Sequence, residues 1–176
     1  MPCSGSPGRG FHALRENCHR KVAGGGNLSA IQEVPASELI NETAIGFAKG
    51  GAIKEPKFAE YVKTGSHKER APSQKDWYFT RLASVLYRVY ADGPLGTESL
   101  RTYYGGRKNR GVKPEKFRKA SGKVVRSCLQ ELEKGGLIQK HKKGGREITA
   151  KGQSLLEKNA KELLKKKPKK ESLVQA

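Results

Sequence analysis

The feature that most constrains the fold is the spacing of apolar residues and glycines between residues 120 and 164. Residues 120–134 carry apolar side chains at steps of three and four, as an amphipathic helix does: Val124, Val125, Cys128, Leu129 and Leu132. Two short runs, 136–141 and 146–150, flank Lys142-Lys143-Gly144-Gly145, which is typical of a hairpin turn. Leucines then recur at helical spacing within 149–166. This segment predicts a helix, a short hairpin and a second helix.

A helix, a short strand, a glycine-containing turn, a short strand and a helix form the layout of a winged helix. We expect Leu129 and Leu132 to anchor the first helix in the core. Leu137 and Ile148 place the hairpin beneath that helix, and the turn projects outward. The expected fold class is mainly α, a winged-helix-like helical bundle with one short β-hairpin, the wing.

The strongest helical pattern precedes this unit, at residues 76–93. One face is apolar and is expected to be buried: Phe79, Leu82, Ala83, Leu86, Val89 and Tyr90. A second face carries Trp77, Arg81, Ser84 and Arg88 at steps of four, three and four. Shorter helices are predicted within residues 34–51, before Gly50-Gly51, and within residues 95–104.

The ends of the chain differ from its middle in composition. Residues 1–33 are rich in Gly, Ser and Pro and lack an apolar period, so we expect a disordered extension. Residues 34–164 form the expected winged-helix-like domain. Residues 165–176 form a basic C-terminal tail that we expect to be mobile.

Charge restricts the partners more than the fold. The formal net charge is +19, from 36 Lys and Arg against 17 Asp and Glu. A chain with this excess repels itself unless a polyanion neutralises it. No run approaches the roughly 20 apolar residues that span a bilayer, so nucleic acid is favoured over a membrane.

The positive charge is densest from Arg101 to Arg126, which hold ten Arg or Lys and a single acid, Glu115. Its first part, residues 101–114, includes Tyr103-Tyr104 and three glycines, and no apolar period passes through that part. Arginine pairs bidentately with phosphate, glycine lets a backbone approach a ligand closely, and an aromatic ring stacks on an unpaired base. We therefore interpret the segment around residues 101–114 as a connector that lies against a folded polyanion.

The charge leaves open whether the partner is RNA or DNA, and an enzyme is the other class of protein to consider. The basic residues come from several elements, which suits a protein embedded in structured RNA: Arg81, Arg88, Arg107, Lys123, Arg126, Lys142 and Arg146. The alternative is a free-standing winged-helix DNA-binding regulator. An enzyme is not expected, because the chain has no G-x-S-x-G and no H-E-x-x-H motif.

Three widely spaced cysteines without C-x-x-C indicate no metal site, and we expect no cofactor and no small-molecule substrate. The thiols and the lack of an apolar secretory signal favour the cytosol or nucleus. We interpret Cys128 as a thiol of the core, because it falls on the apolar face of its helix.

Three long motifs carry a resemblance to a known family. They are "DWYFTRLASVLYRVY" from Asp76, "YYGGRKNRGVKP" from Tyr103, and "CLQELEKGGLI" followed by "GGREITAKGQSLLEKNA". In these motifs the chain resembles the small-subunit ribosomal protein S19e family of archaea and eukaryotes, over about Val34 to Leu164. One departure is Tyr87, where the family usually has an arginine ten residues after the tryptophan; Arg88 is its neighbour.

The resemblance implies a winged-helix-like protein in the head of the small ribosomal subunit. It implies that residues 34–164 contact small-subunit ribosomal RNA (rRNA) and neighbouring proteins of the head. It also implies a part in maturation of that RNA and in assembly of the subunit. The implied location is the cytoplasmic ribosome, with nucleolar passage if the source is eukaryotic. Charge and resemblance together give these candidate rRNA-binding residues: Trp77, Arg81, Arg88, Tyr104, Arg107, Lys108, Arg110, Lys113, Arg118, Lys119, Lys123, Arg126, Lys142, Lys143 and Arg146.

Overall fold

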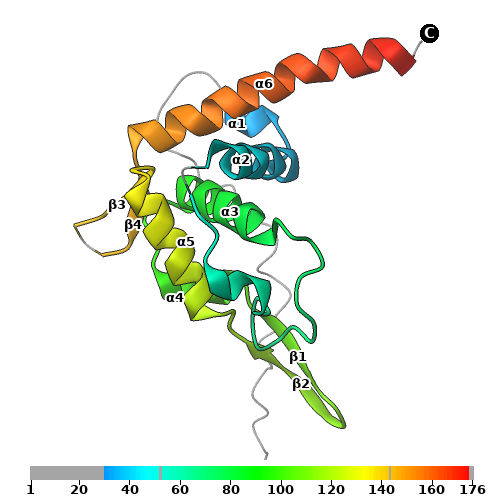
Figure 1. The fold of residues 1–176 in the computed structure, drawn as a ribbon, viewed down its shortest axis with the longest axis vertical. Helices are drawn as coiled ribbons and strands as arrows, with labels where there is room; N and C mark the ends of the chain where they lie inside the picture. Colours follow the sequence, from blue (N-terminus) through cyan, green and yellow to red (C-terminus); the bar gives the residue numbers. More distant parts are fainter. Residues whose placement is uncertain (1–29, 52, 143, 175–176) are drawn as a thin grey trace, which may run out of the picture.

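The described part of the chain is mostly helical, with two small antiparallel hairpins (Figure 1). The computed structural model describes residues 30–174 except 52 and 143, and the side chains as far as residue 166. In chain order the elements are α1 (Ala30–Glu33), α2 (Ala36–Gly50), the 3₁₀ helix η1 (Lys57–Glu60), α3 (Trp77–Asp92), α4 (Thr97–Tyr103), β1 (Gly106–Arg110), β2 (Lys113–Arg118), α5 (Gly122–Lys134), β3 (Ile138–Lys140), β4 (Arg146–Ile148) and α6 (Ala150–Val174).

The predicted winged-helix-like fold class is confirmed. β3 and β4 pair antiparallel, with Ile138 opposite Ile148, and form the wing after α5. The backbones of Leu95 and Arg146 exchange two hydrogen bonds, of 3.0 and 2.9 Å, which add a one-residue third strand to the wing. The order α3, Leu95, α4, α5, β3 and β4 is therefore the helix, strand, helix, helix, strand, strand order of a winged helix.

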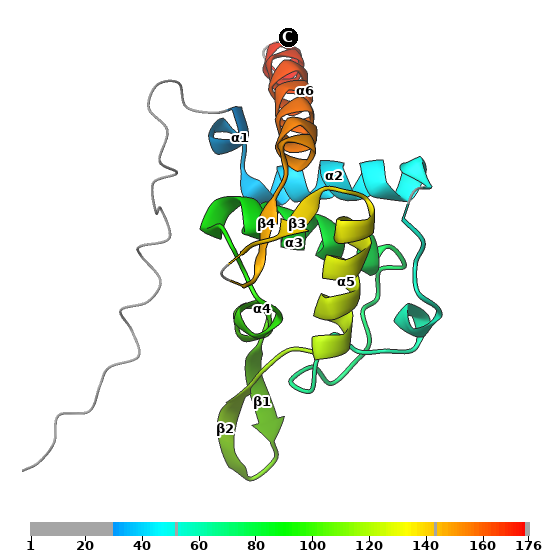
Figure 2. The ribbon, with the colours of Figure 1, turned by 90° about the vertical axis from the view of Figure 1, so that its left-hand side faces the viewer.

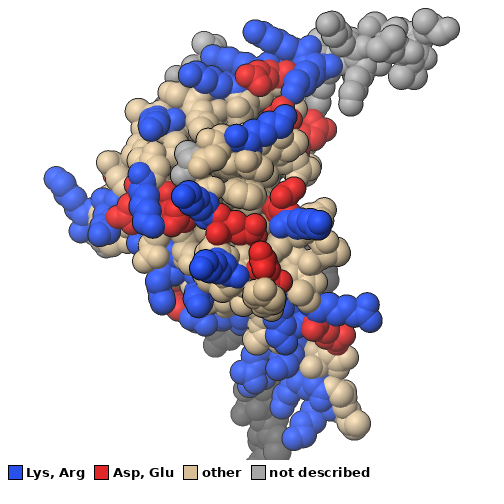
Figure 3. All heavy atoms as spheres, viewed as in Figure 1, with Lys and Arg blue, Asp and Glu red and all other residues tan. Residues whose placement is uncertain are grey.

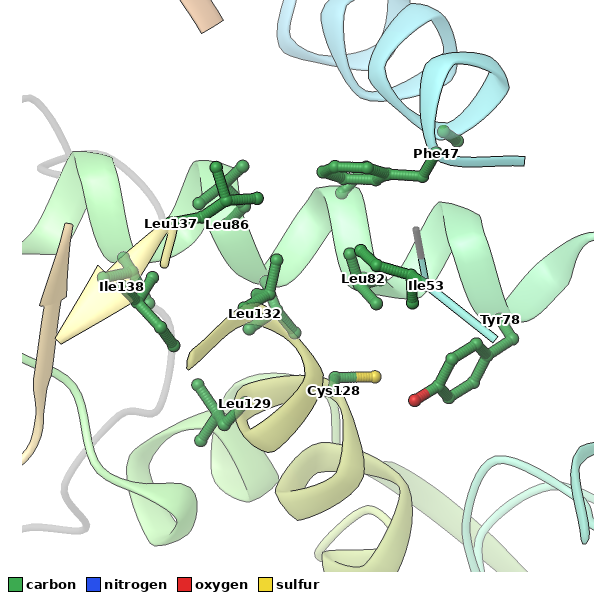
Figure 4. Packing of buried hydrophobic residues seen from close by; sticks show 14 of the residues in the cluster. Phe47, Ile53, Tyr78, Leu82, Leu86, Cys128, Leu129, Leu132, Leu137 and Ile138 are labelled. Atoms are coloured by element: carbon green, nitrogen blue, oxygen red, sulfur yellow. The ribbon is translucent and has the colours of Figure 1, made fainter. Parts of the chain in front are cut away.

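The core is built around α3, which packs against α2, α5, α6 and β4. Its buried residues cover more than one face of the helix: Trp77, Tyr78, Leu82, Ala83, Val85, Leu86 and Val89. Figure 4 shows Phe47 of α2 on one side of α3 and the leucines of α5 on the other. Each fully buried leucine stabilises the fold by about 1.5–3 kcal/mol relative to an exposed one.

Cys128 of α5 is a thiol of the core, as the sequence predicted. Its side chain is fully buried, and the Tyr78 hydroxyl points toward its sulfur (Figure 4). Burial raises the pKa of Cys128 to about 12, because the charged thiolate would lose its hydration. The thiol therefore stays protonated at neutral pH and contributes packing rather than chemistry.

The first and last helices extend the folded part beyond the boundaries expected from sequence. Ile31 of α1 is 1% exposed, although it falls in the segment assigned to a disordered extension. The helix α6 packs against α1 and α2 and continues to Val174, past residue 164. A single ion pair of 2.5 Å joins Lys166 to Glu42 of α2. The rest of the predicted extension, residues 1–29, lies outside the described residues.

The second hairpin, β1–β2, was not predicted, because we expected an irregular connector there. Every residue of β2 is exposed, so the strand has no buried face and no apolar alternation to identify it. Gly111 makes the turn at a φ of 69°, and its N–H donates to the Asn109 Oδ1 at 2.9 Å. The hairpin projects from the end of the molecule opposite α6 (Figures 1 and 2).

The Leu132→Ala variant tests the assigned core. Leu132 is fully buried between α5 and α3, so truncation should lower the free energy of unfolding by about 2–5 kcal/mol. Thermal or denaturant unfolding measures the change. The matched control is Val112→Ala, at the fully exposed tip of the hairpin, which should stay within about 0.5 kcal/mol of the parent. Equal midpoints for the two variants would contradict this packing.

Candidate nucleic-acid interface

The β1–β2 hairpin concentrates the positive charge of the chain. Residues 106–119 hold one acid, Glu115, and seven basic residues: Arg107, Lys108, Arg110, Lys113, Lys116, Arg118 and Lys119. All of these basic side chains except that of Lys108, which is half-buried, are exposed. In Figure 3, Lys and Arg cover the lower end of the molecule, whereas Asp and Glu gather across the middle of this face.

The strand register sets like charges opposite each other. Lys108 lies opposite Lys116, and Arg110 lies opposite Lys113. Like charges at directly opposed positions destabilise a two-stranded sheet. Among the described residues, Arg107 is the strand cation with a carboxylate beside it, since its guanidinium lies 3.5 Å from Glu115. The hairpin therefore carries an electrostatic cost that a bound polyanion would remove.

The base of the hairpin is held by close contacts at two glycines. A Cβ on Gly105 would lie 2.6 Å from the Phe117 ring and 2.7 Å from the Arg118 carbonyl oxygen. A Cβ on Gly106 would lie 3.0 Å from the His67 ring. We expected these glycines to let a ligand approach the backbone, but the structure gives them an intramolecular role. Only glycine lets the loop, β2 and the end of α4 meet this closely.

Backbone hydrogen bonds hold the same region on its other side. Ala120 N donates to the Arg101 carbonyl, and Ser121 N donates to the Thr64 carbonyl, both at 3.0 Å. Burial lowers the pKa of His67, and the charges of Lys68 and Arg81 lower it further, so this imidazole is neutral at pH 7. The charged hairpin therefore extends from a base that backbone hydrogen bonds and close packing hold in place.

A stack of arginines and tyrosines joins α3 to the end of α4, beside the hairpin. The Arg81 guanidinium lies 4.0 Å from the centre of the Tyr104 ring, and Arg88 lies 4.1 Å from that of Tyr103. The Ser84 and Tyr104 hydroxyls are hydrogen-bonded at 2.8 Å. The predicted second face of α3 is therefore correct for Arg81, Ser84 and Arg88, and it is occupied by tyrosines of the same chain.

Trp77 does not share that face, contrary to our expectation. Its side chain is 9% exposed and belongs to the core, where its ring meets the edge of Tyr78 at 6.0 Å. Other elements cover α3 on several sides, so Trp77, one turn before Arg81, is still enclosed. Most of the indole is therefore enclosed, and the part that lines a surface pocket is what a ligand could reach.

Arg88 only partly replaces the arginine that the family usually has where this chain has Tyr87. Tyr87 is half-buried on α3, and burial raises its pKa. Arg88 pairs with Asp92 at 2.5 Å in addition to its contact with Tyr103. Its guanidinium is therefore engaged within the protein, so it is not an open substitute for the arginine that the family usually has at position 87.

The other candidates fall into engaged and open groups. Arg146 of the wing pairs with Glu133 at 3.2 Å and lowers the pKa of that carboxyl group. Lys119 pairs with Glu98 at 2.9 Å, and Lys123 lies over the Phe58 ring. The side chains of Arg126 and Lys142 are exposed. Lys143 lies outside the described residues.

The candidates thus do not form one patch. The structure brings the largest group together on the hairpin: Arg107, Lys108, Arg110, Lys113 and Arg118. Arg81, Arg88 and Tyr104 form the adjacent stack, whereas Arg146 belongs to the wing on another side of the molecule (Figure 1). Our candidate set missed Lys116 and Tyr103. Lys116 was part of the basic run, and Tyr103 was one of the two adjacent tyrosines, so both signals were present.

The helix order, the wing and the added basic hairpin define a winged-helix protein with a charged arm. The family model for ribosomal protein S19e matches residues 30–166. Small ribosomal subunit protein eS19 of Aeropyrum pernix is 47% identical over 134 residues, covering 75% of this chain and 88% of that protein. Proteins eS19G of Ascaris suum and eS19B of Schizosaccharomyces pombe are 40% and 38% identical, covering 77% of this chain and 92% and 94% of their own lengths.

The chain belongs to the ribosomal protein S19e family, and the resemblance found in its motifs is confirmed. This is a family of structural ribosomal proteins rather than enzymes. Among the described helices, none is long and apolar enough to cross a membrane. Within the same residues, no three His, Cys, Asp or Glu side chains are grouped so that they would hold a metal ion.

The Lys116→Glu variant tests the opposed charges of the hairpin. It places a carboxylate across from Lys108, so repulsion becomes attraction, and amide hydrogen exchange of β1 and β2 should slow by about two- to fivefold. Lys116→Gln should give an intermediate effect. Both gains should shrink at 1 M salt, because these side chains are exposed and screened. Faster exchange in Lys116→Glu would show that the two lysines do not repel each other.

Proposed function

We propose that this chain is a structural constituent of the small-subunit head that binds small-subunit rRNA. It is needed for maturation of the small-subunit precursor RNA and for assembly of the subunit. The hairpin supports this proposal most strongly, because its opposed cations have almost no acids of their own. The relatives are named small ribosomal subunit proteins, and the small ribosomal subunit is an assembly in which such an arm would meet RNA.

The hairpin suits a phosphate backbone better than it suits a protein surface. Each exposed Lys or Arg that meets a phosphate releases condensed counterions, so affinity depends strongly on salt. The fixed base keeps the arm extended, and the RNA replaces the missing acids. The same charges repel one another in the free protein, so their value lies in the bound state.

The DNA-binding alternative is weakened by what surrounds α5. In a winged-helix DNA reader, the N-terminal residues of this helix contact base edges in the major groove. Here Lys123, in the first turn, lies over the Phe58 ring, and Ser121 is bonded to Thr64. The β1–β2 hairpin is inserted directly before α5. A duplex docked on this helix would meet these segments first.

The proposed location follows from the proposed assembly. The protein acts on cytoplasmic ribosomes, after nucleolar passage if its source is eukaryotic, beside neighbouring proteins of the head. The exposed side chains of Tyr61 and Ile45 offer apolar surface that is suited to such neighbours.

RNA binding as a function of salt tests the role of the hairpin. If about six phosphates are neutralised, the log–log slope of affinity against salt should lie near −4 to −5. Lys108→Ala with Lys116→Ala should make the slope shallower by about 1.4–1.8. The control is Lys134→Ala with Lys140→Ala, which removes equal charge beside Glu131 and Glu133 and should leave the slope unchanged.

The same pair of variants separates the two functions in cells. Where the hairpin variant is the only copy, mature small subunits should fall and their RNA precursors should accumulate, while the control supports normal levels. The tagged parent protein should sediment with small subunits. Equal slopes and equal subunit levels for the two variants, or a parent protein found only with chromatin, would contradict the proposed function.

A further inference from the structure

Arg81 differs from the other half-buried arginines of the described chain. Arg88, Arg101 and Arg146 each pair with a carboxylate, supplied by Asp92, Glu98 and Glu133. Among the described residues, no carboxylate lies within ion-pair distance of Arg81, whose guanidinium contacts the Tyr104 ring instead. A half-buried charge without a counter-ion is costly unless a ligand supplies the opposite charge.

A pocket of about 340 Å³ opens beside this guanidinium. No acidic residue of the described part of the chain belongs to its lining. Ile40, Pro72 and Trp77 supply apolar walls, and Gln74 and Thr80 add polar groups near Arg81. This volume falls within the usual range for small-ligand sites, of about 300–1,000 Å³, and one nucleotide is a ligand of this kind. We name this site the Arg81 pocket.

A neighbouring cleft differs from the Arg81 pocket in charge. That cleft, of about 450 Å³, shares Pro72, Gln74 and Trp77 with the Arg81 pocket, but its lining also holds Glu55, Glu60 and Lys75. Its two carboxylates outnumber its one cation, so a phosphate is less favoured there than beside Arg81. The charges of the two cavities therefore favour the Arg81 pocket for an anionic ligand that approaches Trp77.

We propose that the Arg81 pocket binds one unpaired nucleotide of the rRNA. The base lies against Trp77 and Pro72, and the phosphate pairs with the guanidinium of Arg81. The Tyr104 ring, which also lines the pocket, lies 4.0 Å from that guanidinium, and its hydroxyl is hydrogen-bonded to Ser84. Arginine planes and aromatic rings are the groups on which proteins stack unpaired RNA bases. This proposal rests on the proposed function, because it names the part of the RNA that the protein takes up.

The test uses Trp77, the single tryptophan of the full chain, as the reporter. Octaadenylate should change its fluorescence in a saturable way. An abasic ribose-phosphate oligomer of the same length and charge should bind the hairpin but leave the fluorescence unchanged. This comparison needs no variant, so it does not depend on how any substituted protein folds.

Arg81→Lys keeps the charge but loses the planar guanidinium. It should weaken octaadenylate binding by at least about fivefold, because lysine cannot pair bidentately with the phosphate of the bound nucleotide. Binding of the abasic oligomer should change by less than about twofold, because the hairpin holds it through phosphates. The control Arg70→Lys, at an exposed position outside the lining of the pocket, should bind octaadenylate like the parent. Thermal midpoints of all three proteins confirm folding.

Equal fluorescence responses to octaadenylate and to the abasic oligomer would overturn the proposal. So would unchanged octaadenylate binding in Arg81→Lys. A response to an octaglutamate peptide and none to octaadenylate would also overturn it, in favour of a protein neighbour at this pocket. None of these results would alter the salt slope of the hairpin variants, so failure of the pocket is distinguishable from failure of the proposed function.

Discussion

The enclosure of α3 is the constraint on which the rest of the structure depends. Helices α2, α5 and α6 and strand β4 all pack against it, and seven of its residues are buried. One stripe remains, with Arg81, Ser84 and Arg88, and it meets the tyrosines at the end of α4. Because α4 leads directly into β1, the packing of α3 also fixes where the basic hairpin leaves the core.

This arrangement separates stability from charge. The buried side chains are almost entirely apolar, and Thr43, a buried polar residue, donates its hydroxyl to carbonyls one turn back in α2. The opposed cations of the hairpin lie outside this core, so their repulsion affects a local element rather than the whole fold. The glycine contacts of Gly105 and Gly106 hold the base of that element in place. The protein therefore accommodates a repulsive arm because the arm is fixed by shape and not by charge.

The sequence predicted those parts of the fold that have a regular apolar period. The helix with Cys128 and Leu132 and the wing around Gly144-Gly145 were recognisable because one face of each is buried. The β1–β2 hairpin has no buried face, so only its charge was visible. Partners distant in sequence were also invisible, as when Glu133 engages Arg146 or Glu98 engages Lys119. For this reason the candidate list held both exposed cations and cations that pair with carboxylates of the same chain.

The open cations and Arg81 would recognise RNA in different ways. Exposed hairpin charges are screened by salt and respond to any phosphate backbone, so they hold RNA without reading it. Arg81 is half-buried beside apolar walls, where screening is weaker and where a nucleotide must leave its stack to enter. Since the two sites are joined through α4, a strand held by the hairpin stays close to the Arg81 pocket. The hairpin then supplies general affinity, and the pocket selects the places in folded RNA where a base is already unpaired.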